Sequence, residues 1–365
     1  MELRRRVLGW STALVMVLVG SIVVSAAIGP VGIDPVIVAK SILNSLSIPT
    51  DIHTTPATLP FVEWTIPTPS VSYTPLFGFD VHGPHESIVV DLRLPRIALA
   101  ATVGTGLAAA GTVMQGFFRN PLADPSIIGV SSGAAVGAVA MLAFPAFFPF
   151  AELHLAAFVG ALATAGLVYA IATDGGRTPV ATLLLAGVAV QTFLGAVISY
   201  LLVHSGDSLR AAVYWMMGRL RDSTWGDVEF TLPFVIVGVT VLLAYTRELN
   251  VLLLGEEDAH HLGIDVERTK LLLLLVSSVV TAAGVAVAGI IGFVGLVVPH
   301  MMRLVVGPDH RILLPTSALA GASFLVLTDT IARSGPVEVP VGIVTAAVGA
   351  PFFLFLLARK EVHAL

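Results

Sequence analysis

The chain has 365 residues, of which 56% are hydrophobic and only 12% are charged, and its mean hydropathy is +0.93. This composition excludes a soluble globular protein and predicts an all-α, polytopic integral membrane protein. The net charge of -5, spread over so much apolar sequence, gives no basis for nucleic-acid binding. Because the chain has no cysteine, disulfides and thiolate metal sites are also excluded, and no other spacing predicts a metal site.

Apolar runs recur along the whole chain and predict about ten transmembrane helices, some of them broken by glycine or proline. They lie near residues 7–28, 95–115, 126–148, 154–172, 180–203, 231–246, 271–289, 293–306, 312–331 and 340–358. An even number of spans puts both termini on one side of the membrane. Basic residues at both ends, Arg4 to Arg6 and then Arg359 with Lys360, place that side in the cytoplasm. We therefore expect a multi-pass protein of the cell membrane, in contact with its lipid.

The first predicted helix occupies residues 1–28, and an extracytoplasmic loop follows at 29–91. The apolar run at 7–28 is too long for the core of a signal peptide. The loop contains nine prolines. Within it we expect a short interfacial helix at 35–47 and an irregular, proline-stiffened chain at 48–86.

The stretch after this loop shows its helix boundaries most clearly. Pro95 suits the first turn of a helix, and residues 97–114 include no ionisable side chain. Asp124 followed by Pro125 is typical of an N-cap with proline at the first helical position, so a second helix should begin there. Glycines inside both helices permit close approach of neighbouring backbones.

These same residues resemble a known family. RLPR, a Gly/Ala-rich helix and then QGFFRNPLADPSIIGVSSGA are similar to the permease subunit of the iron-chelate and vitamin B12 (FecCD-type) ABC importers. The resemblance continues in LGEEDAHHLGIDVER, GFVGLVVPHMMRLVVGPDHRILLP and EVPVGIVTAAVGAPFFLFLL. It predicts a permease core at residues 92–358.

The resemblance also implies a substrate and partners. WMMGRL, DHRILLPTSALAGAS and EVPVGIVTA are most similar to vitamin B12 permeases, which makes cobalamin the expected substrate and a ferric siderophore or haem the alternative. The expected partners are two ATP-binding subunits on the cytoplasmic side, an extracytoplasmic substrate-binding protein and a second copy of the chain in a homodimer.

The chain itself is not expected to be an enzyme. No G-x-x-x-x-G-K-[ST] sequence is present, so there is no loop to hold the phosphates of ATP. Hydrolysis must then belong to a partner, and the chain needs no cofactor of its own.

The largest inner loop, residues 247–270, should contain a short surface helix. Acidic residues stand where the helix would begin, histidines where it would end, and Gly263 suits the position after the C-cap. The resemblance identifies this helix, at about 256–262, as the coupling helix that contacts the ATPase. Its ATPase-coupling residues would be Gly255, Glu256, Glu257, Ala259, Leu262 and Gly263.

Two further sites are implied by the resemblance. The outer arginines that dock the binding protein would be Arg93, Arg96 and Arg333, with anchoring to lipid head groups as the alternative. The inner gate would be Thr178, Pro179, Val180, Ala181 and Thr182, between predicted helices 4 and 5.

A pattern of glycine, alanine and proline recurs at an offset of 178 residues and predicts an inverted repeat of helices 2–5 and 7–10. Such a repeat also occurs in ion-coupled secondary transporters, which remain the alternative of another class. A transporter of that kind would need acidic side chains inside the membrane to bind its coupling ion, and only Asp329 comes near. Asp329 and Arg333 are four residues apart and could pair instead, with Glu338 close by.

Overall fold

The computed structural model describes residues 2–29, 31–59, 62–147 and 152–358. Seven of its helices are long and apolar enough to cross a membrane. They are α1 (Glu2–Ala27), α4 (Leu94–Phe117), α6 (Leu153–Ala172), α7 (Val180–Val203), α9 (Trp225–Ala244), α12 (Val266–Ala288) and α14 (His310–Ala332). Three shorter apolar helices are α5 (Val130–Ala143), α13 (Val294–Val306) and α15 (Val341–Ala358). These ten helices coincide with the ten predicted runs, so the predicted all-α membrane class is confirmed.

Short helices connect the long ones. On the side of the predicted outer loop are α2 (Pro35–Ser45) and α3 (Gly83–Ser87), and a π-helical stretch, η1 (Ile88–Arg93), leads from α3 into α4. Single turns of 3-10 helix are η2 (Pro125–Ile128), η3 (Pro145–Phe147) and η4 (Gly206–Ser208). The remaining connectors are α8 (Leu209–Met216), α10 (Thr246–Leu252) and α11 (Glu256–His261).

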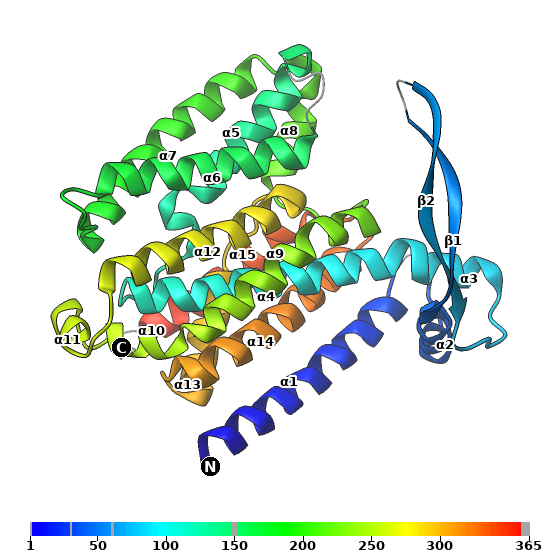
Figure 1. Cartoon of the computed structure of the whole chain (residues 1–365), viewed down its shortest axis with the longest axis horizontal. Helices are drawn as coiled ribbons and strands as arrows, with labels where there is room; N and C mark the ends of the chain where they lie inside the picture. The colour runs from blue at the N-terminus through cyan, green and yellow to red at the C-terminus, as the bar shows by residue number, and fades with distance from the viewer. Residues whose placement is uncertain (1, 30, 60–61, 148–151, 359–365) are drawn as a thin grey trace.

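The predicted interfacial helix is present as α2. Asp34 caps it by accepting a hydrogen bond from the Val36 N–H at 2.7 Å, and Pro35 occupies the first helical position. The prediction of an irregular chain at 48–86, however, is wrong. Its larger part forms an antiparallel hairpin of β1 (Ser47–Leu59) and β2 (Val62–Pro75), which projects from the bundle beside α2 and α3 (Figure 1).

The prolines of this hairpin explain why the prediction failed. In a two-stranded ribbon both outer edges are unpaired, so a residue without an N–H is tolerated there, whereas in a central strand it is not. In the register of the hairpin, Pro56 therefore pairs with Pro67, and Thr54 pairs with Pro69. The intervening threonine, isoleucine and valine residues favour extended backbone, and the proline count concealed that preference.

Helix α4 forms the centre of the bundle and is buried over most of its length. It packs against α9, α12, α13 and α14. Figure 1 shows α5, α6, α7 and α8 grouped on one side of this centre, while α1 lies along the other side. The close contacts depend on glycine. A β-carbon on Gly104 would overlap the backbone carbonyl of Gly321, and a β-carbon on Gly111 would overlap that of Gly295. A chain with larger residues at these points could not bring α4 so near to α13 and α14.

Two sets of helices pack in the same way, which supports the predicted repeat. Helix α4 contacts α13 and α14, and its counterpart α12 contacts α5 and α6. Within the first set α5 contacts α6 and α7, and within the second α13 contacts α14 and α15. The short helices α5 and α13 both begin after a residue of positive φ, Gly129 at 84° and Phe293 at 68°.

The glycine contacts lead to a prediction about stability. Replacing Gly111 by alanine should lower the unfolding midpoint of the purified protein, because overpacking a close contact costs about 1–3 kcal/mol. Gly166→Ala is the matched control, since nothing lies within 4 Å of a β-carbon there and alanine favours helix. Thermal unfolding in detergent measures both. Equal midpoints for the two variants would show that the α4–α13 contact can relax.

Candidate functional site

The predicted coupling helix is present as α11, at the end of the bundle where α1 begins (Figure 1). It is framed by glycines with positive φ, Gly255 at 132° and Gly263 at 85°, backbone conformations that other residues rarely adopt. Ala259, within the helix, is fully buried. Leu254 and Leu262, in contrast, are 62% and 63% exposed. The segment therefore presents leucine side chains outward from the end of the bundle.

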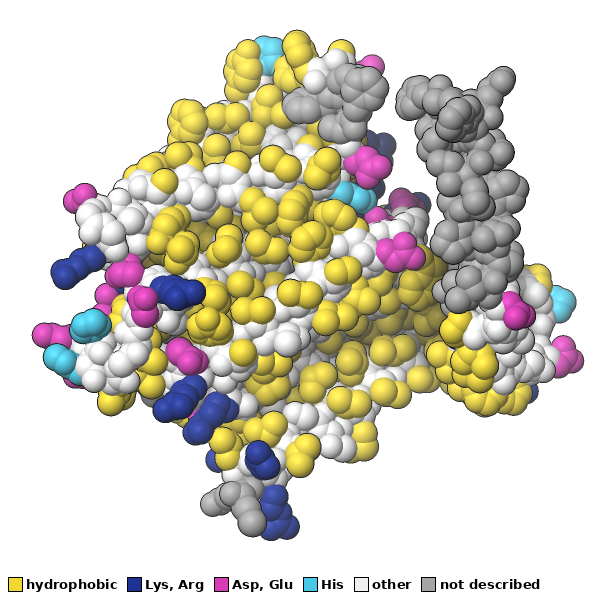
Figure 2. All heavy atoms as spheres, viewed as in Figure 1, with side chains coloured by type: hydrophobic (Ala, Val, Ile, Leu, Met, Phe, Trp, Pro, Cys, Tyr) yellow, Lys and Arg dark blue, Asp and Glu magenta, His cyan; other side chains and the backbone are white. Residues whose placement is uncertain are grey.

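Charge on α11 is arranged to stabilise so short a helix. Glu256, Glu257 and Asp258 occupy the first turn, and His260 and His261 the last. Carboxylates are stabilised near the N-terminus by the positive end of the helix dipole, and the two histidines lie near its negative end. Figure 2 shows acidic, basic and histidine side chains gathered at this end of the molecule, whereas the middle of the visible face has almost no charged side chains.

Helix α10 connects α11 to the bundle through a polar joint with the start of α14. Asn250 donates a hydrogen bond to Asp309 at 2.7 Å, and its side-chain oxygen accepts from the His310 N–H at 2.9 Å. Hydrogen bonds from Arg311 lower the pKa of Asp309 to about 2. The Asp309 carboxylate is thus charged at any pH near neutrality, and the joint stays intact there.

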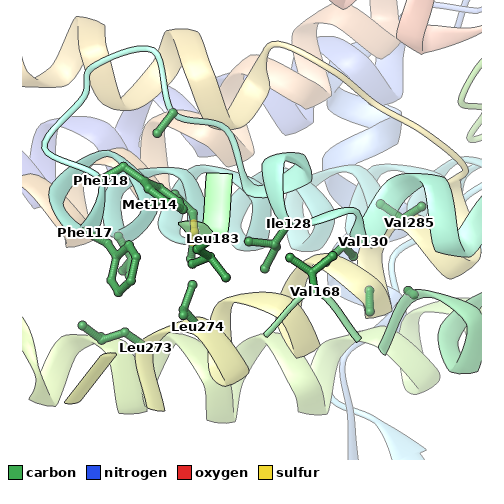
Figure 3. Close-up of a cluster of buried hydrophobic side chains, with 14 of the residues drawn as sticks. Met114, Phe117, Phe118, Ile128, Val130, Val168, Leu183, Leu273, Leu274 and Val285 are labelled. Atoms are coloured by element: carbon green, nitrogen blue, oxygen red, sulfur yellow. The ribbon is translucent and has the colours of Figure 1, made fainter. Parts of the chain in front are cut away.

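The predicted gate segment lies where α7 begins. Thr178 is buried, Pro179 is the N-cap residue of α7, and Ala181 and Thr182 are exposed in the single chain. Lys270 and Glu267 of α12 hydrogen-bond to the backbone of Thr178. One turn further, Leu183 packs among apolar side chains of α4 and α12 such as Met114 and Leu274 (Figure 3).

The predicted docking arginines lie at the opposite end, but two of them point inward. Arg93 is buried and donates hydrogen bonds to the carbonyl oxygens of Ala26, Ala27 and Val31. Arg333 is also buried. It donates to the carbonyl of Ile28 at 2.9 Å and to both the carbonyl and the hydroxyl of Ser25.

The expectation that Arg93 and Arg333 offer free guanidinium groups at the outer surface is therefore corrected. The last carbonyls of a helix lack partners within the helix, and cations are favoured near them. The two arginines satisfy carbonyls at the end of α1 and just beyond it, and so hold this helix against the bundle. We call this pair the α1 clamp.

Arg96 is held differently. Its Nη2 donates to Asp329 Oδ1 at 2.7 Å and its Nε to Asp329 Oδ2 at 2.9 Å, a bidentate ion pair. Its Nη1 lies 2.8 Å from Glu338 Oε1. The predicted pair of Asp329 with Arg333 is confirmed, with 3.5 Å between Nε and Oδ2. Asp329, only 1% exposed, is thus neutralised by two arginines and leaves no open carboxylate for a coupling ion.

Two exposed basic side chains at this end belong to the loop between α8 and α9. Arg219 and Arg221 are exposed, and Arg221 Nε lies 3.8 Å from Glu338 Oε2. A cavity of about 120 Å³ among Arg96, these two arginines and Glu338 is large enough for one acidic side chain but not for a corrinoid. Trp215 and Trp225 flank these two arginines in the sequence, a pattern typical of anchors at the membrane interface. Their approach to Glu338, a residue far along the chain, could not be read from the sequence.

The described residues contain no group of three or more His, Cys, Asp or Glu that could hold a metal ion. The candidate site residues form two separate sets. One surrounds α11 and the start of α7, and the other surrounds Arg96 at the hairpin end.

Comparison with known proteins gives the arrangement its context. Residues 66–359 match the FecCD transport family. The chain belongs to this family. The match includes the predicted core at 92–358 and extends into the hairpin.

Two relatives span most of the chain. The cobalamin import system permease protein BtuC of Halobacterium salinarum is 57% identical over 100% of both chains. The hemin transport system permease protein HmuU of Yersinia pestis is 42% identical over 80% of this chain and 89% of its own. A solved structure of an inward-facing metal-chelate type ABC transporter matches with a TM-score of 0.75 and 31% identity, over 96% of this chain and 98% of that chain.

These findings confirm the predicted class. The chain is a membrane-embedded permease subunit of an ABC importer, and ATP hydrolysis belongs to separate partner subunits. Membership of the family also implies an extracytoplasmic substrate-binding protein as a partner.

Proposed function

We propose that this chain is the permease subunit through which cobalamin crosses the cell membrane. The observation that carries the proposal is the 57% identity, over the full length of both chains, to a cobalamin permease, against 42% to a hemin permease over part of each. A ferric siderophore or haem is the second candidate, since permeases for Fe(3+) dicitrate and hemin are also among the relatives.

The proposed orientation puts α11 and both chain termini in the cytoplasm. The basic residues Arg4 to Arg6, which precede the apolar part of α1, favour this side by the positive-inside tendency. The hairpin and the Arg96 ion pairs then face outward. In this orientation Leu254 and Leu262 lie where an ATP-binding subunit would contact α11.

We also propose that two copies form a homodimer around the pathway, with one ATP-binding subunit on each copy. Helix α7 supports this arrangement, because it carries a row of large apolar side chains that this chain leaves uncovered. They are Leu185, Val188, Phe193, Tyr200 and Val203. The inner gate would then be Thr178, Pro179, Val180, Ala181 and Thr182, with Ala181 and Thr182 on the exposed side of the α7 N-terminus.

Uptake by vesicles tests the proposed function. Vesicles that contain the permease and its ATPase subunit should take up cobalamin only with ATP on the α11 side and binding protein on the other. Leu262→Asp should reduce uptake by more than about tenfold, because burial against the ATPase would leave the new carboxylate unpaired. Leu76→Asp, an exposed leucine at the hairpin end, is the control and should transport normally. Uptake of a ferric siderophore but not of cobalamin would overturn the substrate assignment.

A cysteine at Ala181 tests the gate and the dimer together. Oxidation should join the two copies at this position and stop uptake, and reduction should restore it. Ala211→Cys, at an exposed position of α8 at the hairpin end, is the control and should not block the pathway. Normal uptake with the Ala181 link fully formed would show that the gate lies elsewhere.

For docking, we propose that the binding protein contacts the face where Arg96, Arg219 and Arg221 surround Glu338, while the α1 clamp lies behind it. Exposed ion pairs contribute only about 0–1 kcal/mol each, so these arginines would mainly set register and association rate. The double variant Arg219→Glu with Arg221→Glu should weaken association at low ionic strength without lowering the unfolding midpoint.

Arg93→Met should behave in the opposite way. It leaves the carbonyls at the end of α1 without donors, so it should lower the unfolding midpoint and leave association unchanged. Arg268→Glu, which reverses an exposed charge at the α11 end, serves as the charge control for both measurements. If the Arg219 and Arg221 double variant associates normally at low salt, the docking surface is not here.

A further inference from the structure

Lys270, in the second turn of α12, is a buried charge shared by three segments of the chain. It is 2% exposed. Its Nζ lies 2.8 Å from Glu256 Oε1 in α11, 3.0 Å from Glu267 Oε1 in α12, and 2.9 Å from the carbonyl oxygen of Thr178. An ammonium group has three N–H donors, and these three acceptors can use all of them. A buried cation tolerates the loss of a partner poorly, since the charge is then left unpaired.

The backbone of Thr178 is held on both sides of its α-carbon. Its carbonyl accepts from Lys270, and its N–H donates to Glu267 Oε2 at 3.0 Å. The Thr178 hydroxyl pairs with that of Thr173 at 2.9 Å, across a tight turn that contains Gly175 and Gly176 in positive φ. Thr178 therefore cannot shift alone: it moves with the first turns of α12 or loses two charged partners.

Helix α7 starts two residues after Thr178. Pro179 restricts the backbone directly before this helix. Leu183, one turn further, packs in the apolar cluster that includes Leu274 of α12 (Figure 3). A displacement of the Thr178 peptide is thus passed into α7 over a short, packed length of chain.

One ion pair connects Lys270 to α11. Glu256 is the first residue of α11, and Lys270 is its one ion-pair partner among the described residues. Asp258, also in the first turn of α11, is exposed and has no ion pair within that part of the chain. If α11 moves, the Glu256 contact must either break or carry Lys270 with it, because hydrogen bonds weaken steeply beyond about 3.5 Å.

We propose that Lys270 is the positioning residue that transmits a displacement of α11 to the gate segment at residues 178–182, through Glu256 on one side and the Thr178 carbonyl on the other. This inference rests on the proposed function, which assigns α11 to ATPase contact and 178–182 to the gate. It adds the physical link between them, which neither site contains by itself.

The experiment compares two carboxylates in the first turn of α11. The full importer, with its ATPase and binding protein, is reconstituted in vesicles with Glu256→Gln or Asp258→Asn, and cobalamin uptake is measured per ATP hydrolysed. Glu256→Gln should lower this ratio about tenfold, as expected for loss of a hydrogen bond between charged groups, while Asp258→Asn should leave it unchanged. Retention of the ATPase subunit should be the same in both variants.

A second pair of variants tests Lys270 directly. Lys270→Met should lower the same ratio, and Arg268→Gln, a neighbouring exposed cation, should not. The double variant Glu256→Gln with Lys270→Met should be no worse than Lys270→Met alone, because both changes break one link. If Lys270→Met does not fold, the comparison of Glu256→Gln with Asp258→Asn still decides the question.

Three results would overturn the inference. Equal uptake per ATP for Glu256→Gln and Asp258→Asn would show that no force passes through Glu256. Loss of the ATPase subunit from the Glu256→Gln complex would make Glu256 a docking contact instead. Additive effects in the double variant would separate Glu256 from Lys270. If the wild-type importer itself shows no ATP-dependent cobalamin uptake, the proposed function has failed, a result distinct from these three.

Discussion

A buried charge in this protein must find partners from the chain itself, and that requirement governs how the ends of the bundle are built. The middle of the molecule is apolar and packs through glycine and alanine, but each end contains buried cations. Arg93, Arg333 and Lys270 are all nearly inaccessible and all donate to backbone carbonyls of another segment. Because the partners lie far away in the sequence, each cation joins a peripheral segment to the core. The cost of leaving such a charge unpaired makes these junctions specific.

The features that the sequence predicted correctly are those that depend on neighbours along the chain. Apolar runs defined the spans, Asp34 and Pro35 the start of α2, and the acid-to-histidine order the position of α11. The hairpin was missed because its prolines are tolerated only by the unpaired edges of a two-stranded ribbon, which is a property of the assembled pair rather than of either strand.

In the candidate sites, too, the sequence predicted what depends on neighbours along the chain and missed what depends on distant segments. The sequence indicated that Arg93 and Arg333 lie at the outer end, but their direction depends on where the end of α1 lies, more than 60 residues away from Arg93 and about 300 from Arg333. The contact of Lys270 with the gate segment gave no local signal, since its bond to the Thr178 carbonyl spans 92 residues. Periodicity and capping patterns contain no information about such pairs, whereas a resemblance to a family identifies the segment and not the contact.

Helix α1 shows a consequence of this arrangement for how the protein is made. Only 6% of its membrane-crossing stretch is buried, so polar contacts at its two ends matter to its attachment. Near its start Arg6 donates to the Val306 carbonyl, and at its far end Arg333 donates to Ser25, 308 residues earlier in the chain. Both of these partners follow α1 by about 300 residues in the chain, so they are synthesised long after it. Until they are in place, α1 is held by Arg93 of the α1 clamp and must remain in the membrane by its own hydrophobicity.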